Sequence, residues 1–166
     1  LSVDFDLWLG ESDCYKTIPT VENVLNEKGL LSQSEGAYVV YVNKEDDKAE
    51  MPPLLFKKTN GAYLYPSTDL ATIYDRVKEY NPDHILYVVD NRQALHFKQV
   101  FRTSDKAGII SLDKLEHLGY GTVNGEDGKP YKTRSGQTPK LDNLFKEAKE
   151  ILISKKETNE AMDPSD

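Results

Sequence analysis

The feature that most constrains the fold is the apolar run at residues 85–89, Ile-Leu-Tyr-Val-Val. A continuous run of this length is typical of a strand that is covered on both faces, as in a parallel sheet. Helical spacing of apolar residues precedes it, with Ser67 or Thr68 as the cap of a helix expected at about 68–80. A second helix is expected at about 93–102. The run therefore predicts a central parallel strand with a helix on each side of it in the sequence.

A short strand is expected at residues 62–65, after the Asn60-Gly61 turn and before Pro66. Strand, helix, strand and helix then alternate, which is the pattern of a parallel sheet in an α/β fold. We expect the strands at 62–65 and 85–89 to be adjacent and parallel, with both helices packed on the sheet. Residues 117–123 can form a further strand.

Residues 1–60 are expected to form a separate, small α+β lobe. A helix capped by Thr20 and stopped by Gly29 precedes a β-branched and aromatic strand at 37–42. A second, short strand is expected at 54–56. No catalytic constellation is recognisable in this lobe.

Composition excludes several classes of protein. The net charge of −7 argues against a dedicated nucleic-acid binder, because phosphate contacts need clustered cations. A single cysteine, Cys14, excludes an internal disulfide framework and a multi-cysteine zinc site, and favours a reducing, cytoplasmic compartment. No stretch is long and apolar enough for a membrane helix, and no secretory leader is recognisable. The first residue is Leu1 rather than methionine, which suggests an upstream segment.

The C-terminal third contains a cationic loop in an otherwise acidic chain. Residues 128–140 hold four cations and no acid: Lys129, Lys132, Arg134 and Lys140. A solvated surface loop is the simplest explanation. Thr138-Pro139 then predicts the start of a helix, and residues 154–166 are expected to be a frayed tail.

Three side chains are expected to meet at the carboxyl edge of the sheet, where open α/β sheets bind ligands. They are Tyr65, Asp69 and Gln93, a phenol, a carboxylate and an amide. Together they suit a polar cation, and a carboxylate suits a guanidinium especially well. The alternative for Asp69 is a carboxylate that only stabilises a helix N-terminus. His96 lies one helical turn after Gln93 and can contact a ribose or phosphate, or serve as a structural hydrogen-bonding group.

Other chemistries lack support in the sequence. Histidines and carboxylates do not show metal-ligand spacing, and neither a Walker A motif nor a Gly-x-Gly-x-x-Gly motif occurs. The cations Lys132 and Arg134, beside hydroxyls and a glycine, are suited to a triphosphate and to charge that develops on a pyrophosphate leaving group.

Several segments resemble the catalytic domain of class I arginyl-tRNA synthetases, over roughly residues 5–153. The segment 61–71 reads Gly-Ala-Tyr-Leu-Tyr-Pro-Ser-Thr-Asp-Leu-Ala, and 85–96 reads Ile-Leu-Tyr-Val-Val-Asp-Asn-Arg-Gln-Ala-Leu-His. Residues 129–136, Lys-Pro-Tyr-Lys-Thr-Arg-Ser-Gly, followed by Lys-Leu-Asp-Asn-Leu at 140–144, are similar to the family's signature-loop segment. Residues 9–12, 27–30 and 34–37 are similar to the insertion that the family carries.

The resemblance implies the second half of a class I Rossmann-type parallel-sheet domain at residues 61–153, preceded by a connective-peptide-like insertion at 1–60. It implies activation of arginine with ATP and transfer to tRNA. The matching positions are Tyr65, Asp69 and Gln93 for arginine, and His96, Val123, Lys132, Thr133 and Arg134 for ATP. Lys132 and Arg134 are the expected catalytic residues, with Mg²⁺ accompanying ATP and no dedicated protein metal site.

The sequence also departs from the family pattern. The second signature lysine falls on Thr133, with Lys132 one position earlier, and the His-Ile-Gly-His element is missing. The similar residues 117–120, His-Leu-Gly-Tyr, stand in the wrong place for it. A fragment of the enzyme, inactive and a poor tRNA binder on its own, is therefore expected. The alternative is a free-standing arginine- or nucleotide-binding module without ligase activity.

Overall fold

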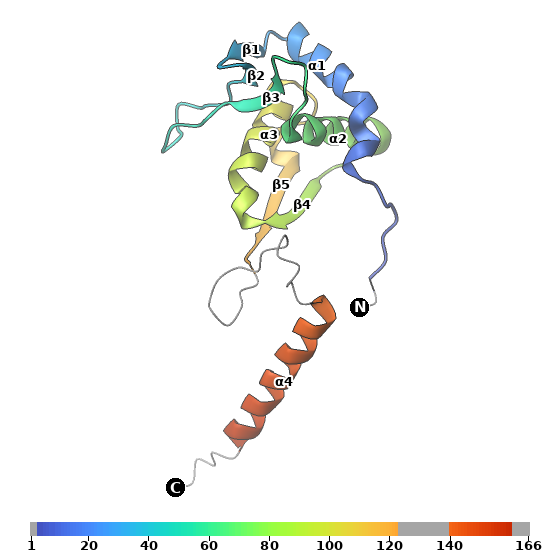
Figure 1. Ribbon diagram of the computed structural model, residues 1–166, viewed down its shortest axis with the longest axis vertical. Coiled ribbons are helices and arrows are strands. Elements are labelled where there is room, and N and C mark those ends of the chain that lie inside the picture. Colours follow the sequence, from blue (N-terminus) through green and yellow to red (C-terminus); the bar gives the residue numbers. More distant parts are fainter. Residues whose placement is uncertain (1–2, 123–139, 161–166) are drawn as a thin grey trace. The chain divides into compact units, whose positions relative to one another are not determined.

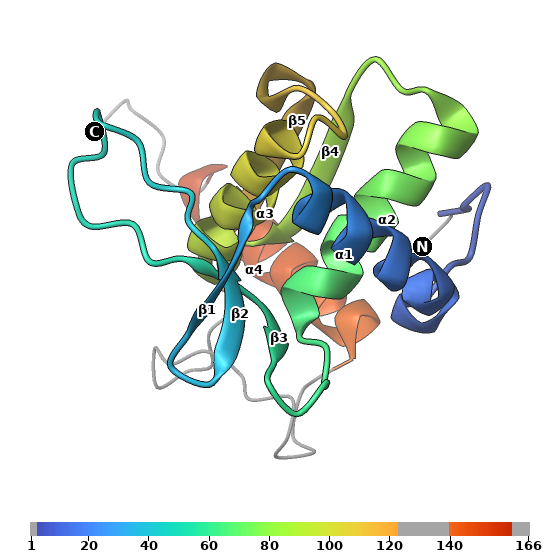
Figure 2. The same cartoon turned by 90° about the horizontal axis from the view of Figure 1, so that it is seen from above.

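The structure, a computed structural model, describes residues 3–122 and 140–160 of the chain. Residues 7–121 form one unit, and the helix near the C-terminus belongs to another. Figures 1 and 2 show the elements of the first unit from two directions.

The N-terminal part of this unit is helical and leads into an antiparallel sheet. Its elements are the 3₁₀ helix η1 (Glu11–Thr17), helix α1 (Ile18–Glu27) and strands β1 (Leu31–Ser34), β2 (Ala37–Val40) and β3 (Leu54–Lys58). The strands lie side by side in the order β1-β2-β3 (Figure 2). The two expected strands are present, and β1 is an addition. The expected Thr20 cap is wrong because Pro19 occupies the first turn, where its missing N–H costs nothing.

The parallel sheet consists of β4 (Ile85–Asp90) and β5 (Leu115–Tyr120). Ile85 pairs with Leu115 at one end, and Asp90 pairs with Tyr120 at the other. The apolar run is therefore a parallel strand, as predicted, and the chain has a mixed α/β fold.

The expected strand at 62–65 is wrong, so it is not the neighbour of β4. Tyr63 forms an isolated antiparallel bridge with Lys57 of β3, and Tyr65 already begins helix α2 (Tyr65–Tyr80). The physical reason is Pro66, whose fixed φ favours the first turn of a helix. The helix therefore starts before Ser67. This serine, in the first turn, donates its hydroxyl to the Phe56 carbonyl and accepts the backbone N–H of the N-cap residue Leu64 at 3.3 Å.

The remaining elements of the unit connect the two parallel strands or pack beside them. They are 3₁₀ helices η2 (Asn91–Gln93) and η3 (Leu112–Lys114) and helix α3 (Ala94–Lys106). Helices α2 and α3 both occur where they were expected. Asn81 ends α2 in the left-handed conformation, with φ of +43°, which asparagine tolerates better than most residues.

One hydrophobic core runs through both halves of the unit. Completely buried side chains come from either side of residue 60: Ile18, Val21, Leu25, Val40, Val42, Leu54, Phe56, Leu70, Ile73 and Val100. Residues 1–60 thus share their core with residues that follow. The assignment of 1–60 to an insertion in a larger domain stays a prediction.

Strand β4 is covered on one face only by the described residues. Ile85 and Tyr87 are buried, whereas Leu86 and Val88 are 54% and 66% exposed. The expectation of a strand covered on both faces is therefore met for one face. The exposed face continues onto β5, where Leu118 and Tyr120 are also exposed.

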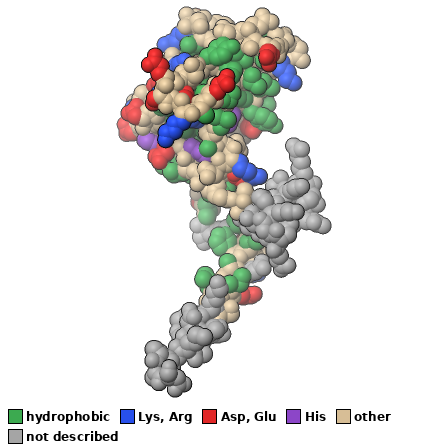
Figure 3. All heavy atoms as spheres, turned by 90° about the vertical axis from the view of Figure 1, so that its left-hand side faces the viewer, with side chains coloured by type: hydrophobic (Ala, Val, Ile, Leu, Met, Phe, Trp, Pro, Cys, Tyr) green, Lys and Arg blue, Asp and Glu red, His purple; other side chains and the backbone are tan. Residues whose placement is uncertain are grey.

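An ion pair fastens the loop before β3 to helix α3. Arg102, which is buried, donates to both carboxylate oxygens of Asp47 at 2.7 Å and to the carbonyl of Val42 at 2.9 Å. Lys98 lies 3.3 Å from the same carboxylate. These donors hold the pKa of Asp47 far below its usual range, with the Arg102 hydrogen bonds as the largest cause. The face that bears this loop shows acidic and basic side chains together (Figure 3).

Asp47→Asn should lower the stability of the chain, because it removes the charge that Arg102 meets with two parallel hydrogen bonds. The pH dependence follows from the lowered pKa. Above about pH 5 the carboxylate is charged in folded and unfolded chains alike, and its stabilisation is complete. Below that pH the unfolded chain gains the proton first, so stability declines as the pH falls. Urea unfolding at pH 7 and pH 3 checks this: the gap between wild type and variant should shrink at pH 3, and an equal gap contradicts it.

Helix α4 (Leu141–Glu160) forms the described part of the second unit. It begins close to the predicted start at Thr138-Pro139, and its apolar residues Leu141, Phe145 and Leu152 are exposed. The helix continues past Ser154 to Glu160, into the segment where a frayed tail is expected, and the fraying itself stays a prediction. Favourable helix formers such as lysine and glutamate allow the continuation despite the lack of apolar periodicity. Residues 161–166 lie outside the described residues.

Candidate functional site

The predicted arginine-pocket residues lie at the starts of α2 and α3. Tyr65 is the first residue of α2 and is 73% exposed. Asp69 follows one turn later and is partly buried. Gln93 is exposed and ends η2, directly before α3 and after the carboxyl end of β4. We expected Tyr65 at the end of a parallel strand. In the structure the start of helix α2 places it instead.

A hydrogen bond joins the two helices at this point. Nε2 of His96 lies 2.6 Å from Oδ2 of Asp69, across 27 residues of sequence. The side chains are 24% and 30% exposed, so water competes only in part for this bond. Phe97 packs edge-on against the His96 ring, with 5.2 Å between centroids. His96 therefore orients the Asp69 carboxylate. In this structure His96, which was predicted to lie near the nucleotide, contacts that carboxylate.

The turn that presents Gln93 is held by its own ion pair. The Asp90 carboxylate accepts the backbone N–H of Arg92 at 2.8 Å and the Arg92 guanidinium at 2.7 Å. These hydrogen bonds lower the pKa of Asp90, with the Arg92 side chain as the largest cause. The turn after β4 is therefore fixed locally, before any ligand is bound.

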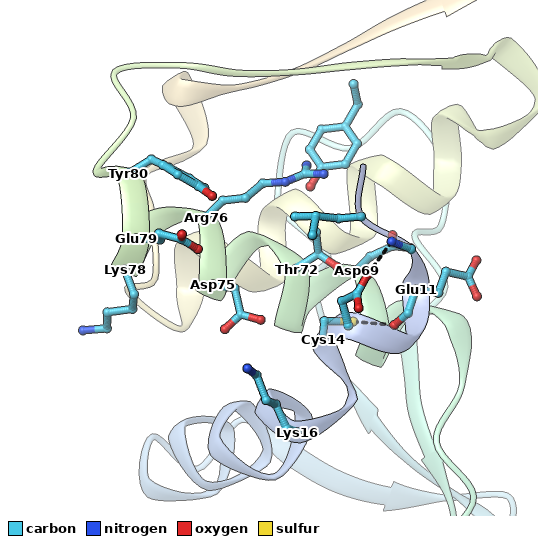
Figure 4. A pocket seen from close by; sticks show the side chains of 14 residues that line it. Glu11, Cys14, Lys16, Asp69, Thr72, Asp75, Arg76, Lys78, Glu79 and Tyr80 are labelled. Carbon is cyan, nitrogen blue, oxygen red and sulfur yellow. Dashed lines mark hydrogen bonds between the residues drawn. The ribbon is translucent and has the colours of Figure 1, made fainter. Parts of the chain in front are cut away.

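Asp69 lines a cavity of about 550 Å³ between η1 and α2 (Figure 4). Its walls are formed by Leu9, Gly10, Glu11, Asp13, Cys14, Lys16, Asp69, Thr72, Asp75, Arg76, Lys78, Glu79, Tyr80 and Tyr87. Tyr65 and Gln93 are not among them. Asp69 therefore lines this cavity without the other two residues, and the shared arginine pocket of all three stays a prediction.

Sequence reasoning missed most of the residues that line this cavity. Thr72 and Arg76 follow Asp69 at helical spacing, so their shared face could have been found from the sequence. The contribution of η1 could not, because nothing in its sequence signals that it packs against α2. Asp75 accepts a hydrogen bond from Thr17 at 2.7 Å, which fastens η1 to α2 beside the cavity.

Tyr87 of β4 closes the cavity from the side of the sheet. Its ring packs against Phe97 and Phe101, with centroids 4.8 and 5.4 Å away, and the Arg76 guanidinium lies 5.3 Å from its centroid. Burial raises the pKa of Tyr87 to about 12, against the opposing charge of Arg76. The phenol is therefore protonated at neutral pH.

The predicted ATP-binding and catalytic residues of the loop, Val123, Lys132, Thr133 and Arg134, lie outside the described residues. Within residues 3–122 and 140–160, no cluster of three or more histidines, cysteines and carboxylates could hold a metal ion. In the same residues, none of the helices has the length and apolarity needed to cross a membrane.

Comparison with known proteins gives a consistent result along the whole chain. Residues 1–165 match the family model of "tRNA synthetases class I (R), catalytic domain". The chain is 50% identical to an arginine–tRNA ligase of Alkaliphilus oremlandii, which matches 100% of this chain and 28% of the relative. It is 51% identical to that of Hyphomonas neptunium, over 87% of this chain and 25% of the relative. The chain thus spans about a quarter of the length of these relatives.

Solved structures show the same relationship. The arginyl-tRNA synthetase of Plasmodium falciparum superposes with a TM-score of 0.67 at 32% identity, over 98% of this chain and 26% of that one. The Thermus thermophilus arginyl-tRNA synthetase gives a TM-score of 0.67 at 20% identity over 98% of this chain and 33% of that one, which supports the fold. The chain belongs to the catalytic-domain family of class I arginyl-tRNA synthetases and corresponds to part of that domain.

Proposed function

We propose that the full-length protein that contains this chain is an arginine–tRNA ligase. In the first step a carboxylate oxygen of arginine attacks the α-phosphorus of ATP, the bond to the β-phosphate breaks, and pyrophosphate leaves. In the second step a terminal ribose hydroxyl of the tRNA attacks the arginyl carbonyl, and AMP leaves. The observation that carries the proposal is the Asp69 carboxylate, which His96 holds at 2.6 Å on the wall of a cavity.

The part of the site that this chain supplies for arginine is centred on Asp69. A carboxylate can accept two N–H groups of a guanidinium at once, which reads both its charge and its planar shape. Tyr65 and Gln93 extend from the adjacent helix starts, where a phenol and an amide can meet the remaining polar groups of the amino acid. His96 acts on this carboxylate as an orienting partner and is also proposed to lie close to ATP.

The cationic loop is proposed to meet the phosphates of ATP. Lys132 and Arg134 neutralise the negative charge that develops as pyrophosphate leaves, and Val123 and Thr133 contribute to ATP binding. Mg²⁺ is expected to accompany the nucleotide, bound mainly by its phosphates, as is usual for this ion.

We further propose that residues 61–153 form the second half of a class I Rossmann-type domain, with residues 1–60 as its insertion. The exposed apolar face of β4 supports this, since in a complete doubly wound domain Leu86 and Val88 would be covered by helices packed on that face of the sheet. The chain by itself is accordingly proposed to be inactive and to bind the arginine tRNA poorly. The full-length protein is proposed to act in the cytoplasm, where its tRNA and ATP occur.

The test is arginine-dependent exchange of labelled pyrophosphate into ATP, measured with tRNA present. The full-length protein should catalyse exchange with arginine, whereas residues 1–166 alone should not. Citrulline should fail as a substrate, because its neutral urea group has the shape of a guanidinium without the charge that Asp69 reads.

The alternative, an arginine- or nucleotide-binding module without ligase activity, gives a different result in the same assay. Calorimetry would then detect arginine or ATP binding to the full-length protein, while exchange and aminoacylation stay at the level of the protein-free control. That outcome would overturn the ligase proposal.

A further inference from the structure

The Tyr87 hydroxyl is an unusual group in this structure. Tyr87 is 9% exposed, and in the part of the chain that the structure describes its Oη is the one buried side-chain polar atom without a hydrogen-bond partner. Leaving a buried hydroxyl unpaired is costly, so an unpaired one calls for an explanation. A phenylalanine would fill the same space without this cost.

The ring of Tyr87 is fixed, so its hydroxyl has a defined position. Phe97 and Phe101 pack against the ring from α3, at 4.8 and 5.4 Å between centroids. The residue also lines the cavity that Asp69 lines, and it reaches the cavity from β4 while Asp69 reaches it from α2. Tyr87 and Asp69 thus line one space from a strand and a helix, and the Tyr87 hydroxyl itself lies buried behind the cavity surface.

The charges around the cavity favour a cationic ligand. Five carboxylates line it, Glu11, Asp13, Asp69, Asp75 and Glu79, against three cations, Lys16, Arg76 and Lys78. A guanidinium offers only N–H donors, so each of its partners must accept a hydrogen bond. A phenol oxygen can accept one of these N–H groups while the carboxylate accepts others.

We infer that the Tyr87 hydroxyl is a further specificity-determining group for arginine, accepting an N–H of the substrate guanidinium beside Asp69. This inference rests on the proposed function. In the free chain the Arg76 guanidinium lies over the Tyr87 ring, 5.3 Å from its centroid, and helps to cover the hydroxyl (Figure 4 shows Arg76 extending from α2). Arg76 is only partly buried, so its long side chain can swing aside when the substrate enters. The hydroxyl then gains the partner that it lacks.

The test is Tyr87→Phe in the full-length protein. The arginine KM in pyrophosphate exchange should rise about tenfold, since a hydrogen bond to a charged group is lost, while the ATP KM should change less than twofold. The melting temperature without arginine should be equal to or higher than that of the wild type, because the hydroxyl has no hydrogen bond of good geometry to lose, although the nearby Arg76 side chain acts on it. If the hydroxyl had only a structural role, the variant would melt at a lower temperature and keep the arginine KM of the wild type.

Tyr63→Phe is the matched control, since Tyr63 donates its hydroxyl to Glu22 at 2.6 Å, away from the cavity. This variant should melt at a lower temperature and keep the arginine KM of the wild type. An arginine KM within twofold of the wild type for Tyr87→Phe, or failure of that variant to fold, would overturn the inference. Absence of exchange by the wild type itself would instead overturn the proposed ligase function.

Discussion

Asp69→Asn in the full-length protein should lower kcat/KM for arginine by at least about tenfold, with most of the effect in KM. Asparagine keeps the shape of the side chain and can still bond to His96, which lies 2.6 Å from the carboxylate. The variant therefore removes the negative charge with little change in geometry. The hydrogen bonds from the guanidinium are then accepted by a neutral amide and no longer by a charged carboxylate, so they are weaker. Arginine-dependent pyrophosphate exchange at varied arginine concentrations measures the change.

A suitable control is Asp83→Asn, which removes the same charge from an exposed position in the loop after α2. Its arginine kinetics should match those of the wild type. Wild-type kinetics in the Asp69 variant as well would show that Asp69 only stabilises the start of α2, and the arginine pocket would have to be sought elsewhere.

Lys132→Ala should reduce kcat for adenylate formation on the order of a hundredfold, with a smaller change in ATP binding. The lysine is proposed to neutralise charge that forms as pyrophosphate leaves, and such an interaction is stronger in the transition state than in the ground state. We expect a larger effect for Lys132 than for Arg134, because a flexible ammonium can follow a moving phosphate while a guanidinium suits a fixed bidentate contact. Single-turnover adenylate formation by the full-length protein is the measurement.

Lys146→Ala serves as the charge-matched control, because Lys146 is exposed within α4 and does not belong to the cationic loop. It should leave single-turnover rates unchanged. If Lys132→Ala keeps its kcat and only the ATP KM rises, the loop binds ATP without acting on the transition state.

The elements with strong local signals could be predicted well from the sequence. The apolar periodicity of α2 and α3 and the run that forms β4 are local properties, and each was found close to its observed position. The strand expected at 62–65 failed because two local signals competed there. Tyr63 and Leu64 favour a strand, but Pro66 starts a helix whose first turn includes Tyr65.

Pairing partners were harder to predict than elements. The partner of β4 is β5, which comes after α3 in the chain and was considered only as a possible further strand. Its sequence, Leu-Glu-His-Leu-Gly-Tyr, has few β-branched residues. Its parallel register depends on how α3 packs on the sheet, and that packing involves side chains distant in sequence.

By itself, the sequence determined the mixed α/β character of the chain, the positions of its main helices and the motifs that link it to arginyl-tRNA synthetases. These are local patterns or strings of residues, and they can be read without knowing which segments touch. Only the tertiary structure decided that His96 pairs with Asp69 and that Tyr87 keeps an unpaired hydroxyl beside the same cavity. The physical reason is that both features arise where a helix or strand meets another one packed against it. Distances between such elements depend on the whole core and not on any one segment.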